Sequence, residues 1–172
     1  MTALWLVVGL VAVQRLAELV HGRRNERRLL AEGGVEHGAG HYPLIAGLHV
    51  AWLASMLLQV PADEPVRWPY LIAYLGVLGA RAWVMASLGA YWTTRIIVVP
   101  GRPPVRRGPY RYLRHPNYLV VAGEIALLPL AFGAWRIAVV YSLLNAVVLA
   151  HRIRVESRAR AAPSGAAPGY RG

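Results

Sequence analysis

Five apolar segments, separated by arginine-rich stretches, constrain the fold of this sequence more than any other feature. They cover about residues 3–20, 44–60, 68–88, 118–135 and 137–150. Each is about 14–21 residues long, and a helix needs about 20 residues, with a lower limit near 17, to cross a bilayer. The last segment reaches this length only if Arg136 and His151 lie among the headgroups. The sequence therefore predicts an all-α integral membrane protein with about five transmembrane helices.

A soluble helical bundle is the alternative fold, and it is disfavoured because the five segments fill most of the chain. Apolar residues make up 56% of the sequence and charged residues only 16%, against about 25% charged residues in a soluble domain. The chain has no cysteine, which excludes a disulfide scaffold, thiol nucleophiles and cysteine-based zinc or iron–sulfur sites. We expect no metal site.

The arginines predict the orientation of the helices in the membrane. Four lie within residues 21–42, six within 95–114 and five after residue 150, whereas residues 61–67 and the link at Arg136 hold one each. Cytoplasmic loops carry the excess of arginine. We therefore expect the amino terminus outside and the carboxyl terminus in the cytoplasm. The net charge of +11 is mostly juxtamembrane, which favours anionic lipids over nucleic acid as the partner.

The two ends of the chain complete this topology. No basic residue precedes the first segment and no cleavage motif follows it, so we expect a retained span rather than a signal peptide. It should continue as a surface helix to Leu30 and end at Gly33 and Gly34. Gln14, Arg15 and Glu18 are expected at the water-facing end of this span. Residues 1–160 are predicted to form one domain, and residues 161–172 a disordered tail.

The loop over residues 101–118 is the first candidate for chemistry. Its prolines fix the backbone, and Pro116 favours an extended conformation at His115. Pro116 and Asn117 suit the first turn of the next helix, where free amides can face a polar or anionic group. Binding to lipid headgroups explains the loop's arginines, but it does not require a rigid turn that carries a histidine and tyrosines.

The second candidate is Arg152-Ile153-Arg154-Val155-Glu156, which follows the last apolar segment. Arg152 and Glu156 are four residues apart, so on a helix they can form a surface ion pair. Five spans, however, bring this segment back beside the loop over residues 101–118. Within the spans, Arg81 and Glu124 are costly to bury and are candidates for function, or for a mutual ion pair.

These motifs together resemble the isoprenylcysteine carboxyl methyltransferases, integral membrane enzymes that use S-adenosylmethionine. The resemblance covers about residues 91–156, and it rests on Gly108-Pro109-Tyr110, Arg114-His115-Pro116-Asn117-Tyr118, a hydrophobic helical hairpin and Arg152-x-Arg154-x-Glu156. It implies a catalytic part over about residues 91–160. Three further motifs resemble a bacterial branch that is associated with type III polyketide synthases and with O-methylation of alkylpyrone lipids. These motifs are Arg24-Asn25-Glu26, His41-Tyr42-Pro43 and Leu88-Gly89-Ala90-Tyr91-Trp92.

The resemblance also implies roles for individual residues. Arg152 would act at the acceptor, and Glu156 would contact the cofactor. The remaining cofactor-binding residues would be Pro104, Val105, Tyr110, His115, Pro116, Asn117 and Tyr118. The chain departs from many relatives at Ser157, where they carry a second acid, and its upstream Arg-Pro-Pro-Val segment is less polar than theirs.

The expected function is O-methylation of a lipophilic carboxylate or acidic enol, such as a prenylcysteine or an alkylpyrone. The reaction would use S-adenosylmethionine at the cytoplasmic face of a bacterial membrane, and a type III polyketide synthase is a candidate partner. Arg81 and Glu124 are candidates to contact the polar head of the acceptor, together with Arg152. The alternatives are a phospholipid or amine N-methyltransferase, for which Arg152 would be poorly suited, and a non-catalytic scaffold that recruits a soluble enzyme.

Overall fold

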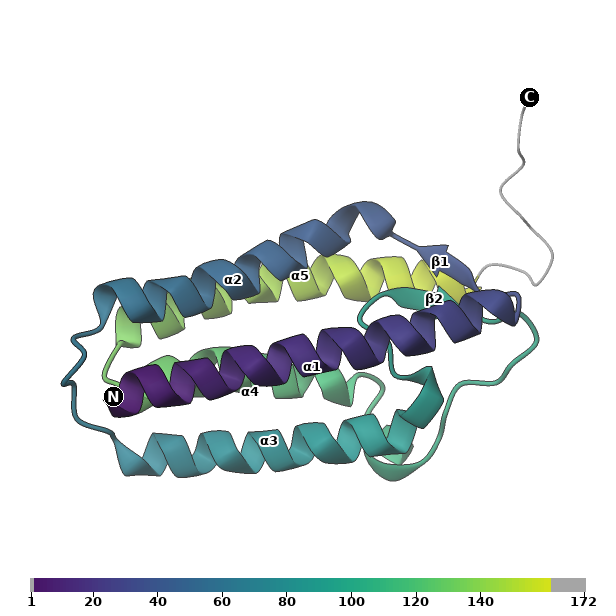
Figure 1. Cartoon of the computed structure of the whole chain (residues 1–172). Coiled ribbons are helices and arrows are strands. Elements are labelled where there is room, and N and C mark those ends of the chain that lie inside the picture. The colour runs from purple at the N-terminus through teal and green to yellow at the C-terminus, as the bar shows by residue number, and fades with distance from the viewer. Residues whose placement is uncertain (1, 162–172) are drawn as a thin grey trace.

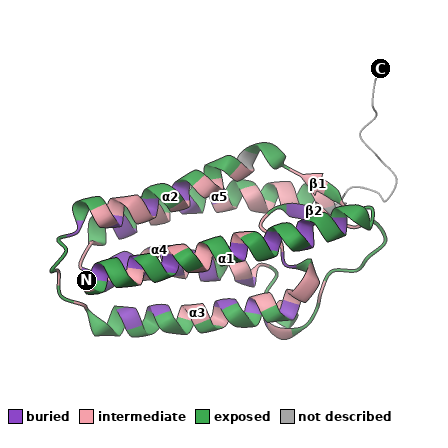
Figure 2. Ribbon diagram, in the orientation of Figure 1, coloured by how far each residue is buried: buried purple, intermediate pink, exposed green. Residues whose placement is uncertain are grey.

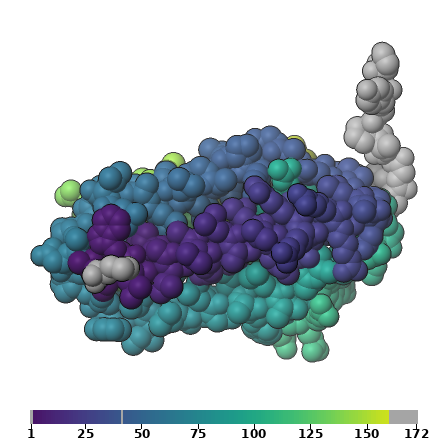
Figure 3. Space-filling model, viewed as in Figure 1, coloured from purple at the N-terminus to yellow at the C-terminus, as the bar shows by residue number. Residues whose placement is uncertain are grey.

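Five long helices form the molecule in a computed structural model that describes residues 2–161. They lie side by side along one axis (Figure 1), and α1 covers one face of the molecule between α2 and α3 (Figure 3). The helices are α1 (Ala3–Ala31), α2 (Tyr42–Gln59), α3 (Trp68–Leu88), α4 (Pro116–Ala131) and α5 (Trp135–Ala161). The predicted tail falls on residues that are almost all outside the described part, although α5 includes residue 161.

The helices confirm the predicted all-α membrane fold. Four of them, α1, α2, α3 and α5, are long and apolar enough to cross a membrane, and α4 is a shorter apolar helix of 16 residues. The fourth segment was expected to continue to residue 135, but α4 ends at Ala131. Gly133 has a φ of 66° and reverses the chain directly into α5, as left-handed glycines do after helices.

The buried core and the exposed surface fit a lipid environment. Trp52, Met56, Ile125 and Leu128 are completely buried between the helices. The outer faces are also apolar, and Figure 2 shows that much of the outer surface of the helices is exposed. Large exposed apolar side chains such as Leu10 are common along α1, α3 and α5, which is the pattern expected where lipid replaces water as the solvent.

The three arginine-rich segments meet at one end of the bundle, as their distribution predicts for segments on one side of a membrane. α1 ends as expected before Gly33, whose φ is 84°. The chain then forms β1 (Val35–His37), which pairs antiparallel with β2 (Ile96–Val98). The end of α5 lies beside this two-stranded sheet (Figure 1). The sheet was not predicted, and it connects the first arginine-rich segment directly to the third.

Ion pairs reinforce this connection. Glu32, at the end of α1, accepts a hydrogen bond from Arg28 at 2.8 Å and pairs with Arg102 at 3.0 Å. The Arg28 hydrogen bond holds the pKa of Glu32 below its usual range. Arg102 also donates to the Tyr91 hydroxyl at 2.5 Å. The loop after β2 is therefore anchored both to α1 and to the end of α3.

Candidate functional site

Four of the predicted site residues meet where α4 begins. The Tyr118 hydroxyl donates to Oε2 of Glu156 at 2.5 Å and accepts from Nε of Arg152 at 3.1 Å. Nδ1 of His115 lies 3.5 Å from the same Glu156 oxygen. The His115 and Tyr118 rings stack with their centroids 5.2 Å apart. The segment after the last span therefore returns to the proline-rich loop, as expected from the topology.

Local sequence explains how α4 presents this cluster. His115 is non-helical, with φ −135° and ψ 58°, and Pro116 opens α4, the position where proline fits a helix best. The Tyr118 amide donates to the His115 carbonyl at 3.1 Å. The two side chains are three residues apart and so lie on one face. On α5, Arg152 and Glu156 are one turn apart and both reach the Tyr118 hydroxyl.

Arg152 is also fixed from the side of β2. Its Nη2 donates to the Thr94 carbonyl at 2.7 Å, and its guanidinium lies 5.7 Å from the centre of the Tyr118 ring. Thr94 is held by Glu26 of α1, which accepts from the Thr94 amide and hydroxyl at 3.2 and 2.8 Å. Nη1 of Arg152 has no partner among the described residues, so it keeps two N–H donors for a ligand.

Of the other predicted cofactor-binding residues, Pro116 and Asn117 belong to the first turn of α4, whereas Pro104, Val105 and Tyr110 lie in the segment before it. Tyr110 lies in a 3₁₀ turn over Gly108–Arg111 and lines a hollow of about 510 Å³. Pro116 is buried, and Oδ1 of Asn117 is buried without a hydrogen-bond partner. Pro104 is exposed and Val105 half-buried, and within residues 2–161 no hydrogen bond connects either of them to the cluster.

Arg81 and Glu124 form part of a buried network of four charges. Nη1 of Arg81 donates to Oε2 of Glu124 at 2.9 Å, so the mutual ion pair that the sequence left open beside a functional role is present. Arg81 also donates from Nε and Nη2 to the two oxygens of Glu18, with 2.6 Å between Nη2 and Oε2. Arg15 connects the two carboxylates, at 3.2 Å from Glu18 and 2.7 Å from Glu124. Glu18 and Arg81 are 7% and 6% exposed, and Glu124 is fully buried.

The expectation that Arg15 and Glu18 lie at the water-facing end of the first span is therefore wrong. The Arg15 and Glu18 side chains are only 14% and 9% exposed, because both face the neighbouring helices and pair with Arg81 and Glu124 there. The sequence did hold a signal for this network. Arg15 and Glu18, of opposite charge, lie in the first apolar segment, and Arg81 and Glu124 are the charges inside the third and fourth segments.

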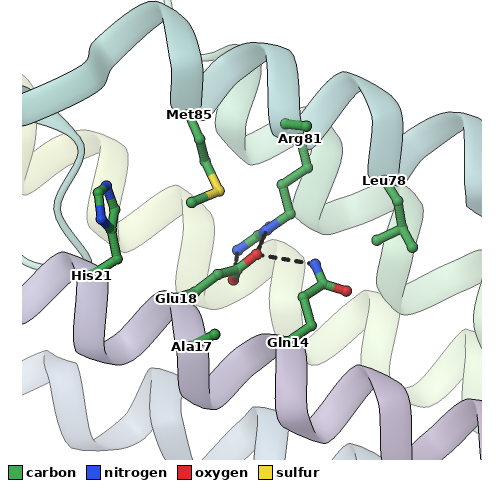
Figure 4. Close-up of a pocket in the computed structure, with 8 residues that line it drawn as sticks. Gln14, Ala17, Glu18, His21, Leu78, Arg81 and Met85 are labelled. Atoms are coloured by element: carbon green, nitrogen blue, oxygen red, sulfur yellow. Dashed lines mark hydrogen bonds and ion pairs between the residues drawn. The ribbon is translucent and has the colours of Figure 1, made fainter.

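A cleft of about 360 Å³ opens between α1 and α3 above this network. Figure 4 shows Glu18 and Gln14 extending from α1 toward Arg81 of α3, with Leu78 and Met85 on either side of Arg81. His21 marks the end of the cleft that is nearest to the arginine-rich loops, and its ring lies 5.7 Å from that of Trp92.

Comparisons with known proteins agree with this geometry. Residues 71–162, which include the whole cluster, match the isoprenylcysteine carboxyl methyltransferase (ICMT) family. The chain is 42% identical to the uncharacterized protein YpbQ of Bacillus subtilis, over 90% of this chain and 95% of that protein. It is 26% identical to an uncharacterized protein of Haemophilus influenzae, over 79% and 82% of the two chains. No solved structure is significantly similar. The match over more than half of the sequence shows that the protein belongs to the ICMT family of membrane methyltransferases.

Proposed function

We propose that the protein transfers a methyl group from S-adenosylmethionine to an oxygen of a lipophilic acceptor at the cytoplasmic face of the membrane. The observation that carries the proposal is the contact between Tyr118, Glu156 and Arg152. A carboxylate and an arginine with free donors lie beside one tyrosine, at the end of the bundle that holds the arginine-rich segments. This arrangement offers a cofactor-binding group and an acceptor-binding group within one site.

The residues present fit S-adenosylmethionine. Its hydroxyl and amino groups are donors, and the cluster offers the Glu156 carboxylate and the buried, unpartnered Oδ1 of Asn117 as acceptors. Its carboxylate can pair with arginines, and the hollow beside Tyr110 is lined by Arg106, Arg111 and Arg114 among others. The cofactor supplies an electrophilic methyl group, so the protein needs no metal and no covalent nucleophile for the transfer.

Arg152 would hold the acceptor oxygen. An acidic enol or a carboxylate is largely ionised near neutral pH, and the free Nη1 of Arg152 can bind it through a charge-assisted hydrogen bond. Tyr118 and Thr94 fix the guanidinium, which limits its motion and so favours one orientation of the acceptor. Such positioning can lower the barrier by about 7–11 kcal/mol in favourable systems.

Alkylpyrones and prenylcysteines are the acceptors that this site would suit, and a type III polyketide synthase is the candidate partner for the first of them. An amine acceptor is less suitable, because Arg152 would repel any protonated form of it. A scaffold without catalysis has no need of the rigid Arg152–Tyr118–Glu156 arrangement and would tolerate changes there.

Substitution of Arg152 tests the proposal. Arg152→Ala should lower the rate of methyl transfer to an acidic acceptor by roughly 30- to 1000-fold, the effect of losing about 2–4 kcal/mol of anion stabilisation. Arg152→Lys keeps the charge but loses the planar fork, so it should restore only part of the rate. Arg158→Ala is the matched control, because Arg158 is an exposed arginine of the same helix outside the Arg152-x-Arg154-x-Glu156 motif.

The assay is transfer from labelled S-adenosylmethionine to an alkylpyrone, to a prenylcysteine and to an amine lipid. Calorimetry on His115→Ala and Glu156→Ala should show weaker cofactor binding. Near-normal rates for Arg152→Ala, or methylation of amine lipids alone, would contradict the proposed O-methylation. Unchanged cofactor affinity in both other variants would contradict the proposed pocket.

A further inference from the structure

Glu26 of α1 binds two consecutive backbone amides in the segment that connects α3 to β2. Its Oε1 accepts from the Thr94 amide at 3.2 Å, from the Thr94 hydroxyl at 2.8 Å and from the Arg95 amide at 3.1 Å. Glu26 is only 7% exposed, and a buried carboxylate is costly unless hydrogen bonds replace its water. These three bonds therefore stabilise Glu26 and at the same time fix the backbone at Thr94 and Arg95.

The peptide group between Thr94 and Arg95 connects Glu26 to the candidate acceptor residue. The Thr94 carbonyl and the Arg95 amide belong to this one planar group. All described peptide bonds are trans, so the carbonyl and the amide point to opposite sides. Glu26 binds the amide, and Nη2 of Arg152 donates to the carbonyl at 2.7 Å. Without Glu26 the group is free to rotate and to withdraw its carbonyl from Arg152.

Asn25 holds the same segment at its other end. Its Nδ2 donates to the Trp92 carbonyl at 2.8 Å and to the Gly89 carbonyl at 3.2 Å. Asn25 is 9% exposed, so these bonds are largely shielded from competing solvent. Two neighbouring side chains of α1 thus fix residues 89–95 from beginning to end.

Asn25 and Glu26 belong to one of three sequence motifs for which the proposed site has no role. The Tyr42 ring, from a second motif, lies 4.9 Å from the Arg95 guanidinium. All three meet at residues 89–95, and they are Arg24-Asn25-Glu26, His41-Tyr42-Pro43 and Leu88-Gly89-Ala90-Tyr91-Trp92. The first two lie outside the residues that match the ICMT family, so the match gives them no function.

We propose that Glu26 is a positioning residue for the methyl transfer and acts on Arg152 through the Thr94–Arg95 peptide group. The inference rests on the proposed function for the role of Arg152. The guanidinium is held at Nε by Tyr118 and at Nη2 by Thr94, and these two contacts set the direction of Nη1. An arginine that can turn still binds the acceptor, but it holds the acceptor in several orientations, few of which suit the transfer.

The kinetics of Glu26 variants test this role. Glu26→Ala should lower kcat for an alkylpyrone or a prenylcysteine roughly 10- to 100-fold, the effect of a small misplacement of a bound reactant. The KM for the acceptor and the affinity for S-adenosylmethionine should not change. Glu26→Gln keeps an oxygen for the same amides and should restore most of kcat. Glu26→Asp keeps the charge but withdraws the carboxylate by one methylene, so it should restore little.

Glu36→Ala is the matched control. Glu36 of β1 also binds Arg95, but at the guanidinium, with 2.9 Å between Nη1 and Oε1. Its removal takes a glutamate from the same region and leaves the Thr94–Arg95 peptide group in place, so kcat should equal that of the wild type. An equal loss of kcat in Glu36→Ala and Glu26→Ala would overturn the inference.

A double-mutant cycle shows whether Glu26 acts through Arg152. In a chain that already carries Arg152→Ala, Glu26→Ala should lower kcat no further, because no guanidinium remains to be positioned. A general loss of stability would act in both backgrounds. The same fold reduction by Glu26→Ala with and without Arg152 would therefore overturn the inference.

Nitrogen NMR of the arginine side chains tests the positioning without turnover. In the full-length protein in detergent, the two Nη groups of Arg152 should give separate signals, because Tyr118 and Thr94 hinder rotation of the guanidinium. Loss of these signals in Arg152→Lys assigns them. They should merge in Glu26→Ala and stay separate in Glu26→Gln and Glu36→Ala.

The NMR result distinguishes a failure of the inference from a failure of the proposed function. Separate Arg152 signals in Glu26→Ala would overturn the inference, whatever the activity. Merged signals, in a protein whose wild type methylates no acceptor, would refute the proposed function and leave the effect of Glu26 on Arg152 established.

Discussion

Removal of Glu124 tests whether the four buried charges depend on one another. Glu124 is fully buried, and its Oε2 accepts from Arg15 at 2.7 Å and from Arg81 at 2.9 Å. Glu124→Leu preserves most of the side-chain volume but leaves two arginines facing one glutamate. Loss of one partner from a buried ion pair costs about 3–5 kcal/mol, because the remaining charge is left without compensation.

The size of the expected effect follows from the length of the chain. For domains of this size, 1 kcal/mol corresponds to about 2–4 °C in the unfolding midpoint. Glu124→Leu should therefore lower the midpoint by roughly 6–20 °C. Thermal unfolding of the detergent-purified protein, followed by circular dichroism, measures this shift. Glu64→Gln is the control, because Glu64 forms only a long, partly exposed pair with Arg67 at 3.9 Å.

A second substitution separates loss of charge balance from loss of packing. Combining Glu124→Leu with Arg15→Leu removes one charge of each sign and leaves the Arg81–Glu18 pair intact. The double variant should recover most of the lost stability, because paired removal of buried charges is often neutral. A double variant that loses the sum of the two single effects, or a single variant no worse than Glu64→Gln, would refute the idea of a mutually compensating network.

Three further predictions concern topology and the loops. Reporter fusions within residues 61–67 and at the carboxyl terminus should lie on opposite sides of the membrane; the same side for both would refute the arginine-based orientation. Gly108→Ala should destabilise the loop and lower the unfolding midpoint, since Gly108 has a φ of 55° and an added Cβ would lie 2.0 Å from Oγ of Ser87. Glu26→Ala should lower the free energy of unfolding by about 1–3 kcal/mol, because the Thr94 amide loses its acceptor. Glu26→Gln should retain most of this stability, and chemical denaturation measures both.

The sequence predicts the helices well because hydropathy is a local property. The apolar segments, the end of α1 before Gly33 and the position of Pro116 at the start of α4 all follow from neighbouring residues. The meeting of Arg152 with Tyr118 could also be predicted, because the number of spans determines which loops share one side.

Contacts that depend on how helices rotate against each other could not be predicted in the same way. Arg15 and Glu18 were assigned to water because both come late in the first apolar segment. Their burial depends on which faces of α1, α3 and α4 meet. The pairing of Val35–His37 with Ile96–Val98 is equally non-local, since each strand is only three residues long and carries little pattern of its own.

The short length of α4 has a consequence for how a lipid reaches the site. At 16 residues and 1.5 Å per residue, α4 is about 24 Å long, about 6 Å less than the hydrocarbon core of a typical bilayer. If its far end is level with the neighbouring helices, His115 and Tyr118 lie below the headgroups. A long-chain molecule could then reach these residues while its chain stays among the lipid tails. Every methylene that stays there avoids a transfer cost of about 0.8 kcal/mol, so the free-energy cost of reaching His115 and Tyr118 should not rise with chain length.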